Sequence, residues 1–393
     1  MTITRFKIIR KIRELESIRS VNFKKDFLLE KDGIIENPDI LKDKSYSLYC
    51  IDQDERVVAF LHISEPLNVE ENVFLYQDQY KFADNVIVVP YEVFFRVFEE
   101  IDCPSENVCM LFSVGRCGST LLQKILGALP CITSVSEADV YSHVSELLRT
   151  RQIDDSEAVQ LFRCATKHFW NANRKKENYI LLLKFRSEVV SYSQLLQAIP
   201  TTKLLFMYRK PDDVIQSFGR MAGFSMKKDW FLRHRFLSII NKYRIQRVYL
   251  EKENIYKDMT SLLKGIKPLD LIFFLRPNGY FFLWWLLKVN MYMKMRAEKI
   301  PIVALRYEDL INNPERTIRL FLEHVGLETE GVEEACRHMQ HDSQGGTSLA
   351  KSAIGKYCLN SKMRADIDSA IQLYTGLSGV NHILDGTLGH DNG

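Results

Sequence analysis

The stretch that decides the fold is FSVGRCGSTLL, residues Phe112 to Leu122. It overlaps a continuous apolar run, residues 108–114, which predicts a buried strand. After it, leucine and isoleucine recur at helical spacing through residue 129, so the stretch joins a strand to a helix. Gly115 and Gly118 let the backbone approach a ligand closely, and a following helix directs free N–H groups at the loop. We therefore expect a socket for a doubly charged oxyanion.

The loop differs from the phosphate loop of a kinase or GTPase, which carries Gly-Lys-Ser/Thr. Here Arg116 comes two residues before Gly118, and Ser119 and Thr120 follow it. Magnesium-dependent phosphoryl transfer is therefore a less favoured alternative. A small polar turn without a ligand stays open as well, because Gly-Ser-Thr also starts helices.

The alternation of apolar strand and helical pattern repeats three times along the chain. Strands are predicted at residues 180–185, 203–208 and 302–305, each followed by a helix. Such strands indicate a parallel sheet covered on both faces, with ligands at the carboxyl ends of the strands. We predict an α/β fold with a central parallel sheet flanked by helices.

The first hundred residues have a different character. Residues 45–51 and 57–63 are rich in β-formers and flank a polar turn, which predicts a hairpin in a small α+β unit. The expected organisation is residues 1–104 as this unit, 105–330 as the core, and 331–393 as a C-terminal extension. The tail from Gly376 on is expected to be loosely held.

Bulk composition limits the function. The 393 residues carry a net charge of +3, which gives no reason to expect a nucleic-acid binder. The eight cysteines show no zinc-type spacing, which favours reduced thiols and a cytoplasmic protein. The apolar region 269–289 is cut by residues 276–279, and each half is too short to span a bilayer. We interpret it as helix, turn and helix, and expect no transmembrane segment.

Two later stretches place polar residues beyond strands. In residues 204–221, Arg209 follows a strand and Ser217 lies two helical turns further on, so both could close on one phosphate. In residues 302–327, Asn313 and Gly326 mark the ends of a helix. The residues between that strand and helix, 306–309, are expected to brace neighbouring loops.

These three stretches, in this order, resemble the sulfotransferase family. That family moves a sulfuryl group from 3′-phosphoadenosine 5′-phosphosulfate (PAPS) to a hydroxyl or amine on a P-loop NTPase-like fold, without a metal. FSVGRCGSTLL is similar to its 5′-phosphosulfate loop, YRKPDDVIQSF to its 3′-phosphate segment, and LRYEDLINNPERTIRLFLEHVGL to its Tyr-Glu-Asp-Leu segment. The resemblance implies that PAPS is bound by Arg116, Cys117, Gly118, Ser119, Thr120, Arg209 and Ser217. The family also uses a late glycine-containing loop over the 3′-phosphate, so the resemblance makes the polar loop at residues 342–347 of the C-terminal extension a possible lid.

The resemblance also implies a catalytic set of Arg116, Lys184 and a general base. Lys184 matches a Lys-x-His segment of cytosolic members, but Arg186 replaces the histidine, and arginine is no base. Glu137 matches the glutamate that serves as base in carbohydrate-type and many bacterial members. Asp139 and His143 are rival bases, and Glu137 could instead cap a helix.

Two other readings stay open, a kinase on the same fold and a silent nucleotide-binding homologue. The acceptor is expected to be a small molecule or a carbohydrate, with no nucleic acid as partner. The apolar segment near residue 281 favours a lipid-like or aromatic acceptor, whereas the basic stretch 227–276 favours an acidic acceptor. The oligomeric state is not predicted.

Overall fold

The structure is a computed structural model that describes residues 2–13, 20–64, 74–174, 179–186, 189, 191–221, 277–340, 357–375 and 382–390. The basic stretch 227–276 and the possible lid at 342–347 both lie wholly outside these residues. The chain divides into two compact units. The first comprises Met1–Phe112, Thr120–Leu204 and Leu322–His338, and the second comprises Ser113–Ser119, Leu205–Phe321 and Met339–Gly393.

The amino-terminal part of the first unit is a five-stranded antiparallel sheet with the order β2-β1-β5-β4-β3. The predicted hairpin is confirmed, because Tyr46 pairs with His62 and Asp52 with Val57 across a four-residue turn. The elements here are β1 (Ile3–Lys11), α1 (Phe23–Asp26), β2 (Phe27–Ile35), η1 (Pro38–Lys42), β3 (Tyr46–Asp52), β4 (Val57–His62), α2 (Leu75–Phe82), β5 (Asn85–Pro90) and α3 (Tyr91–Glu99).

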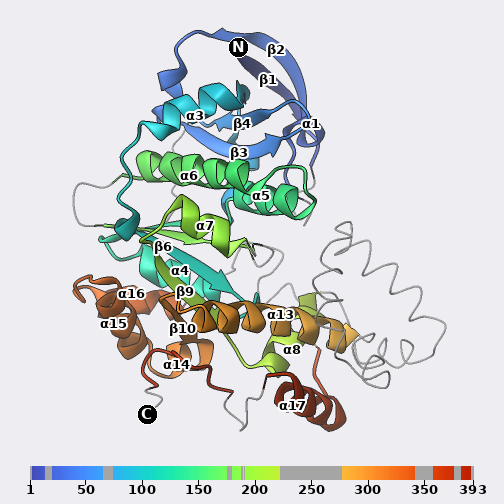
Figure 1. The fold of residues 1–393 in the computed structure, drawn as a ribbon, viewed down its shortest axis with the longest axis vertical. Coiled ribbons are helices and arrows are strands. Elements are labelled where there is room, and N and C mark those ends of the chain that lie inside the picture. Colours follow the sequence, from blue (N-terminus) through green and yellow to red (C-terminus); the bar gives the residue numbers. More distant parts are fainter. Residues whose placement is uncertain are drawn as a thin grey trace, which may run out of the picture. The chain divides into compact units, whose positions relative to one another are not determined.

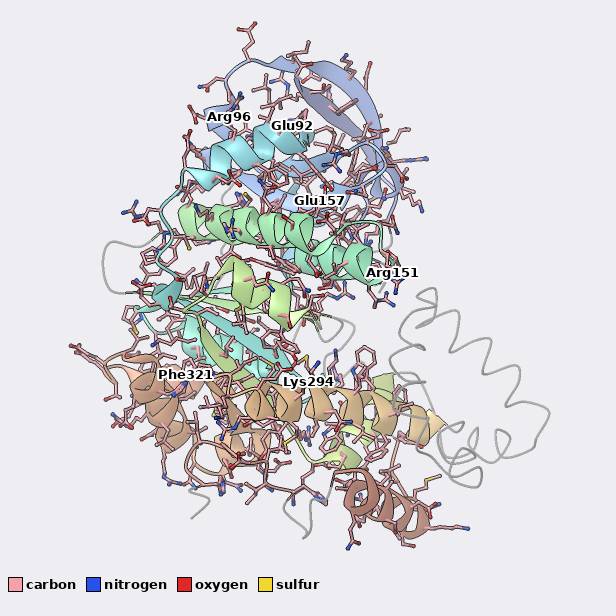
Figure 2. All side chains as sticks on the ribbon, viewed as in Figure 1. Glu92, Arg96, Arg151, Glu157, Lys294 and Phe321 are labelled. Carbon is pink, nitrogen blue, oxygen red and sulfur yellow. The ribbon has the colours of Figure 1, made fainter. Side chains whose placement is uncertain are left out.

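Two helices of the first unit, α5 (Asp139–Arg149) and α6 (Asp155–Ala172), pack on this antiparallel sheet (Figure 1). The buried His168 of α6 accepts a hydrogen bond at Nε2 from the Leu48 N–H, 3.2 Å away. At the β3–β4 turn, Arg56 Nη1 forms an ion pair of 2.8 Å with Oε1 of Glu157, which Figure 2 labels on α6. The antiparallel sheet and these helices therefore form one packed body.

The second sheet has the order β10-β9-β6-β8-β7 and is parallel, which confirms the predicted fold class. Every residue of β8 is buried, as expected for a strand covered on both faces. Its elements are β6 (Val108–Ser113), α4 (Ser119–Gly127), β7 (Ile132–Ser136), β8 (Ile180–Lys184), α7 (Tyr192–Ala198), β9 (Lys203–Tyr208), α8 (Pro211–Met221), α13 (Pro277–Ala297), β10 (Ile302–Arg306), α14 (Tyr307–Asn312), α15 (Pro314–Val325), α16 (Val332–Cys336) and α17 (Ser361–Thr375).

The structure corrects two local predictions. Residues 277–279 are helical and begin α13, so they are not the predicted turn, whereas the helix expected over residues 269–275 lies outside the described residues. The tail is also held more firmly than expected over residues 382–390. Within the second unit, Ala304 of β10 donates its N–H to Gly386 O and accepts at its own carbonyl oxygen from the Leu388 N–H, at 2.9 Å each. This segment therefore pairs with β10.

All eight cysteines are free thiols, and five of them are buried. In the part of the chain that the structure describes, we find no helix that combines the length and the apolar character needed to cross a bilayer.

Candidate functional site

The loop between β6 and α4 has an unusual backbone. Gly115, Arg116 and Gly118 have φ values of 74°, 53° and 85°, all in the left-handed region. Arginine pays a steric cost there, and such strain concentrates at ligand-binding turns. Left-handed residues before a helix start make a concave nest of N–H groups that suits an anion.

Position 118 must be glycine because the Tyr307 ring occupies the space that a side chain there would need. A Cβ atom at position 118 would lie 2.4 Å from the Tyr307 ring, closer than real contacts allow. Arg209 contacts the same ring: its Cζ lies 4.3 Å from the ring centroid, a cation–π distance. Tyr307 therefore links the loop to Arg209 within the second unit.

The residues around Tyr307 brace loops as the sequence predicted. Glu308 Oε1 accepts the Lys210 N–H at 3.1 Å, just after Arg209. Asp309 Oδ2 lies 2.8 Å from His390 Nε2 in the tail segment. Arg306 forms ion pairs with both carboxylates, at 3.1 and 3.7 Å.

The two arginines of the candidate donor site have different partners. Arg116 Nε donates to Ser217 Oγ at 3.0 Å, so the loop and α8 meet through this bond. Arg209 instead lies beside Asp213, with 3.3 Å between Nη2 and Oδ2. The structure thus joins Ser217 to Arg116 directly, a pairing that the sequence analysis did not anticipate.

Three further residues of the stretch, Cys117, Ser119 and Thr120, are buried. Cys117 is fully buried, so a ligand would meet its backbone rather than its thiol. Ser119 is 8% exposed and Thr120 is 5% exposed. Thr120 is the first residue of α4 that belongs to the first unit, and its hydroxyl has a hydrogen-bond partner in that unit.

That partner is Lys184, at the carboxyl end of β8. Its Nζ donates to Thr120 Oγ1 and Ser136 Oγ at 3.1 Å each, and to Glu137 Oε1 at 2.8 Å. An ammonium group has three protons, so these three oxygens match its donor capacity. Lys184 is buried, and a buried cation persists only when it is paired and hydrogen-bonded in this way.

Glu137 occupies a strained turn directly after β7. Its φ is 57°, and its N–H donates to the Lys184 carbonyl oxygen at 2.8 Å. The N-cap of α5 is Ala138, without a side-chain cap, so the alternative that Glu137 caps the helix is wrong. The carboxylate is 19% exposed, which leaves part of it accessible.

The rival base Asp139 is fully engaged. Its Oδ1 accepts from Arg186 Nη1 at 2.6 Å, and its Oδ2 accepts from the Val21 N–H at 2.7 Å. Burial acts to raise the pKa of Asp139, but Arg186, His143 and the Val21 N–H outweigh it and lower the pKa to about 2. So weak a base is poorly suited to accept a proton near neutral pH.

His143, the other rival base, also has a neighbour at each ring nitrogen. Its Nδ1 accepts from the Ile51 N–H at 3.4 Å, and its Nε2 lies 3.8 Å from Asp139 Oδ2. With Nδ1 as acceptor, the proton of the neutral ring is on Nε2. The geometry therefore favours Glu137 over both rivals.

Sequence reasoning missed two aromatic residues beside the cations at the end of β8: the Phe74 ring centroid lies 5.6 Å from Lys184 Nζ, and the Tyr76 ring centroid lies 5.2 Å from Arg186 Cζ. Phe74 and Tyr76 lie in a part of the chain without a recognisable motif. Tyr307 belongs to a segment that the sequence predicts to brace loops. Only the structure shows that its ring fills the space beside Gly118.

A family model described as a sulfotransferase domain matches residues 107–365. No curated protein matches the chain. The antiparallel sheet lies before the matched residues.

Solved sulfotransferases are similar to the chain at low identity. The structure of a sulfotransferase from Alicyclobacillus acidocaldarius is 15% identical, covers 70% of this chain and 94% of its own, and has a TM-score of 0.40. Sulfotransferase STF9 from Mycobacterium avium is 12% identical, with coverages of 72% and 81% and a TM-score of 0.38. Mouse sulfotransferase SULT7A1 complexed with PAP is 12% identical, with coverages of 74% and 91% and a TM-score of 0.37.

Proposed function

The chain belongs to the sulfotransferase domain family, and from that premise we propose that it transfers a sulfuryl group from PAPS to a hydroxyl or amine. The observation that carries the proposal is the loop after β6, where three left-handed residues precede a helix and Arg116 bonds to Ser217. This arrangement collects N–H groups, a hydroxyl and a guanidinium, which are the donors that phosphate and sulfate oxygens need.

The residues of the second unit fit the anionic groups of such a nucleotide. The backbone from Arg116 to Ser119 and the Arg116 side chain would hold its 5′ end, and Arg209 and Ser217 its 3′-phosphate. When bound, PAPS supplies the sulfuryl group. Arginine keeps its charge at any working pH, so both guanidinium groups stabilise negative charge without a metal.

Glu137 is the proposed base that takes the proton of the acceptor. Lys184 holds its carboxylate at 2.8 Å and so orients it. Lys184 also bonds to Thr120, which directly follows Ser119 of the loop in the chain. Lys184 therefore connects the proposed base to α4, the helix that follows the loop. The acceptor itself belongs to the small molecules or carbohydrates that we expected from the family.

A calorimetric titration with 3′-phosphoadenosine 5′-phosphate (PAP), beside one with ATP and magnesium, tests the donor site. We expect PAP to bind, and Arg209→Ala to weaken it at least about tenfold, because a charge-assisted bond to phosphate is lost. Arg296→Ala is the matched control, since Arg296 forms an ion pair with Asp385 in the same unit and should leave the affinity unchanged.

The same titrations separate the alternatives. Binding of magnesium-ATP alone would replace the sulfotransferase proposal with a kinase. Binding of PAP without turnover of PAPS, in a screen of phenolic, alcoholic and sugar acceptors, would favour a silent homologue.

A further inference from the structure

The antiparallel sheet module, residues 2–104, has no counterpart in the matched family range, yet it reaches the neighbourhood of Glu137. The Val21 N–H donates to Asp139, two residues after Glu137, at 2.7 Å. The Ile51 N–H donates to His143 on the next turn of α5 at 3.4 Å. The module therefore holds the start of α5 by two bonds to side chains.

Two aromatic residues of the module contact the cations at the end of β8. The Phe74 ring centroid lies 5.6 Å from Lys184 Nζ, and the Tyr76 centroid lies 5.2 Å from Arg186 Cζ. Both distances fall within the range of cation–π attraction, which strengthens when the pair is removed from water. Phe74 and Tyr76 are 6% and 7% exposed, so these pairs are desolvated.

The contacts form a chain that ends at Glu137. Tyr76 covers Arg186, and Arg186 binds Asp139 at 2.6 Å. Asp139 is the first residue of α5, separated from Glu137 only by Ala138. A left-handed glutamate persists only where its surroundings hold it, and these contacts supply the support on the α5 side.

The charge of Glu137 also acts on Tyr76 of the antiparallel sheet module. The pKa of Tyr76 is raised, chiefly by burial, and the negative charges of Glu137 and Asp139 add to the rise. The positive charge of Arg186, whose Cζ lies 5.2 Å from the Tyr76 ring centroid, acts in the opposite direction and lowers this pKa.

We propose that the antiparallel sheet module is part of the acceptor-activating site, with Tyr76 as a positioning residue that holds Glu137 through Arg186 and Asp139. This rests on the proposed role of Glu137 as the base. The module thus has a function in the reaction, beyond packing on α5 and α6.

Hydrogen exchange in the full chain tests the positioning directly. The Glu137 amide, which donates to Lys184 O, reports on the turn before α5. In Tyr76→Leu, which keeps an apolar side chain but removes the ring, this amide should exchange about tenfold faster. Tyr76→Phe keeps the ring and should restore slow exchange.

Tyr80→Leu is the matched control. Tyr80 is in the same helix α2 and equally buried, but its ring stacks on Phe27 and its hydroxyl donates to Arg13 O. Its loss should leave the Glu137 amide unchanged. Unchanged exchange in Tyr76→Leu, or equal acceleration in both leucine variants, would overturn the proposal.

Kinetics then connect the position to the reaction, with 4-nitrophenol as probe acceptor and PAPS as donor. Tyr76→Leu should lower kcat by about 10- to 100-fold, because a displaced base loses its alignment, while the KM for PAPS stays constant. Tyr76→Phe should recover the rate, and a wild-type rate in Tyr76→Leu would contradict the proposal.

Absence of turnover in the wild type would instead count against the sulfotransferase function, whereas the exchange result would still decide whether Tyr76 positions Glu137.

Discussion

Lys184 shows how much of the candidate site depends on a single side chain. The sequence places it at the end of a strand, and the structure agrees on that position. Its partners Ser136 and Glu137 lie 48 and 47 positions earlier in the chain, and no periodicity links them to it. The sequence therefore predicted the residue types at the strand ends but not the ion pair that organises them.

The first prediction concerns Glu137. Glu137→Gln keeps the size of the side chain and an oxygen for Lys184, but an amide does not accept a proton. Turnover of PAPS should fall at least about 100-fold, the usual contribution of a general base, while the PAP affinity stays unchanged.

Glu146→Gln provides the control for this change, because Glu146 is paired with Arg149 on the far end of α5. It should turn over like the wild type. If Glu137→Gln did the same, Glu137 would have no role in the mechanism.

At the scale of elements, apolar runs identified β6, β8, β9 and β10 almost to the residue. The strand β7 (Ile132–Ser136) was not predicted, because ITSVS is short and three of its five residues carry hydroxyl groups. All five are nevertheless buried. Tertiary packing made a strand from a sequence whose local pattern resembles a loop, which is a general weakness of periodicity as a signal.

The loop between β6 and α4 yields the prediction at this scale. Gly118→Ala adds a Cβ that meets the Tyr307 ring at 2.4 Å, at a φ of 85°. The backbone penalty and the overpacking together should lower the free energy of unfolding by about 2–4 kcal/mol, measured by urea titration. PAP binding should weaken as well, because the loop must shift.

Gly326→Ala separates the two causes. Gly326 has a similar φ of 76°, but nothing lies within 4 Å of its virtual Cβ. That variant should lose only the backbone part, about 1 kcal/mol. Combining Gly118→Ala with Tyr307→Ala should recover part of the loss, and strict additivity of the two changes would show that the ring contact is unimportant.

At the scale of the whole molecule, β-rich runs predicted the amino-terminal hairpin and apolar runs predicted the parallel sheet, but neither predicted that α5 and α6 pack on the antiparallel sheet. The packing depends on polar contacts such as His168 with the Leu48 N–H, 120 residues apart. Phe60, Phe98 and Phe169 surround the same imidazole. Contacts at such separations leave no trace in a local window of sequence.

This buried histidine predicts how stability depends on pH. Burial lowers the pKa of His168 from 6.5 to about 3. Between these values the unfolded chain binds a proton that the folded chain excludes. The free energy of unfolding should therefore decrease as the pH falls from 6.5 to 3, by up to about 1.4 kcal/mol per pH unit from this group.

His168→Gln keeps an acceptor for the Leu48 N–H but removes the titration. Denaturant unfolding at several pH values should give a shallower dependence for the variant than for the wild type. Parallel curves would mean that His168 takes up its proton without unfolding.

The contact between Gly118 and Tyr307 also has an evolutionary meaning. The ring occupies the space that any side chain at position 118 would need. Among descendants of a common ancestor with this loop, the two positions are expected to change as a pair, with glycine retained wherever the aromatic ring is retained. A lineage that replaced the tyrosine by a small residue would be the one free to lose the glycine.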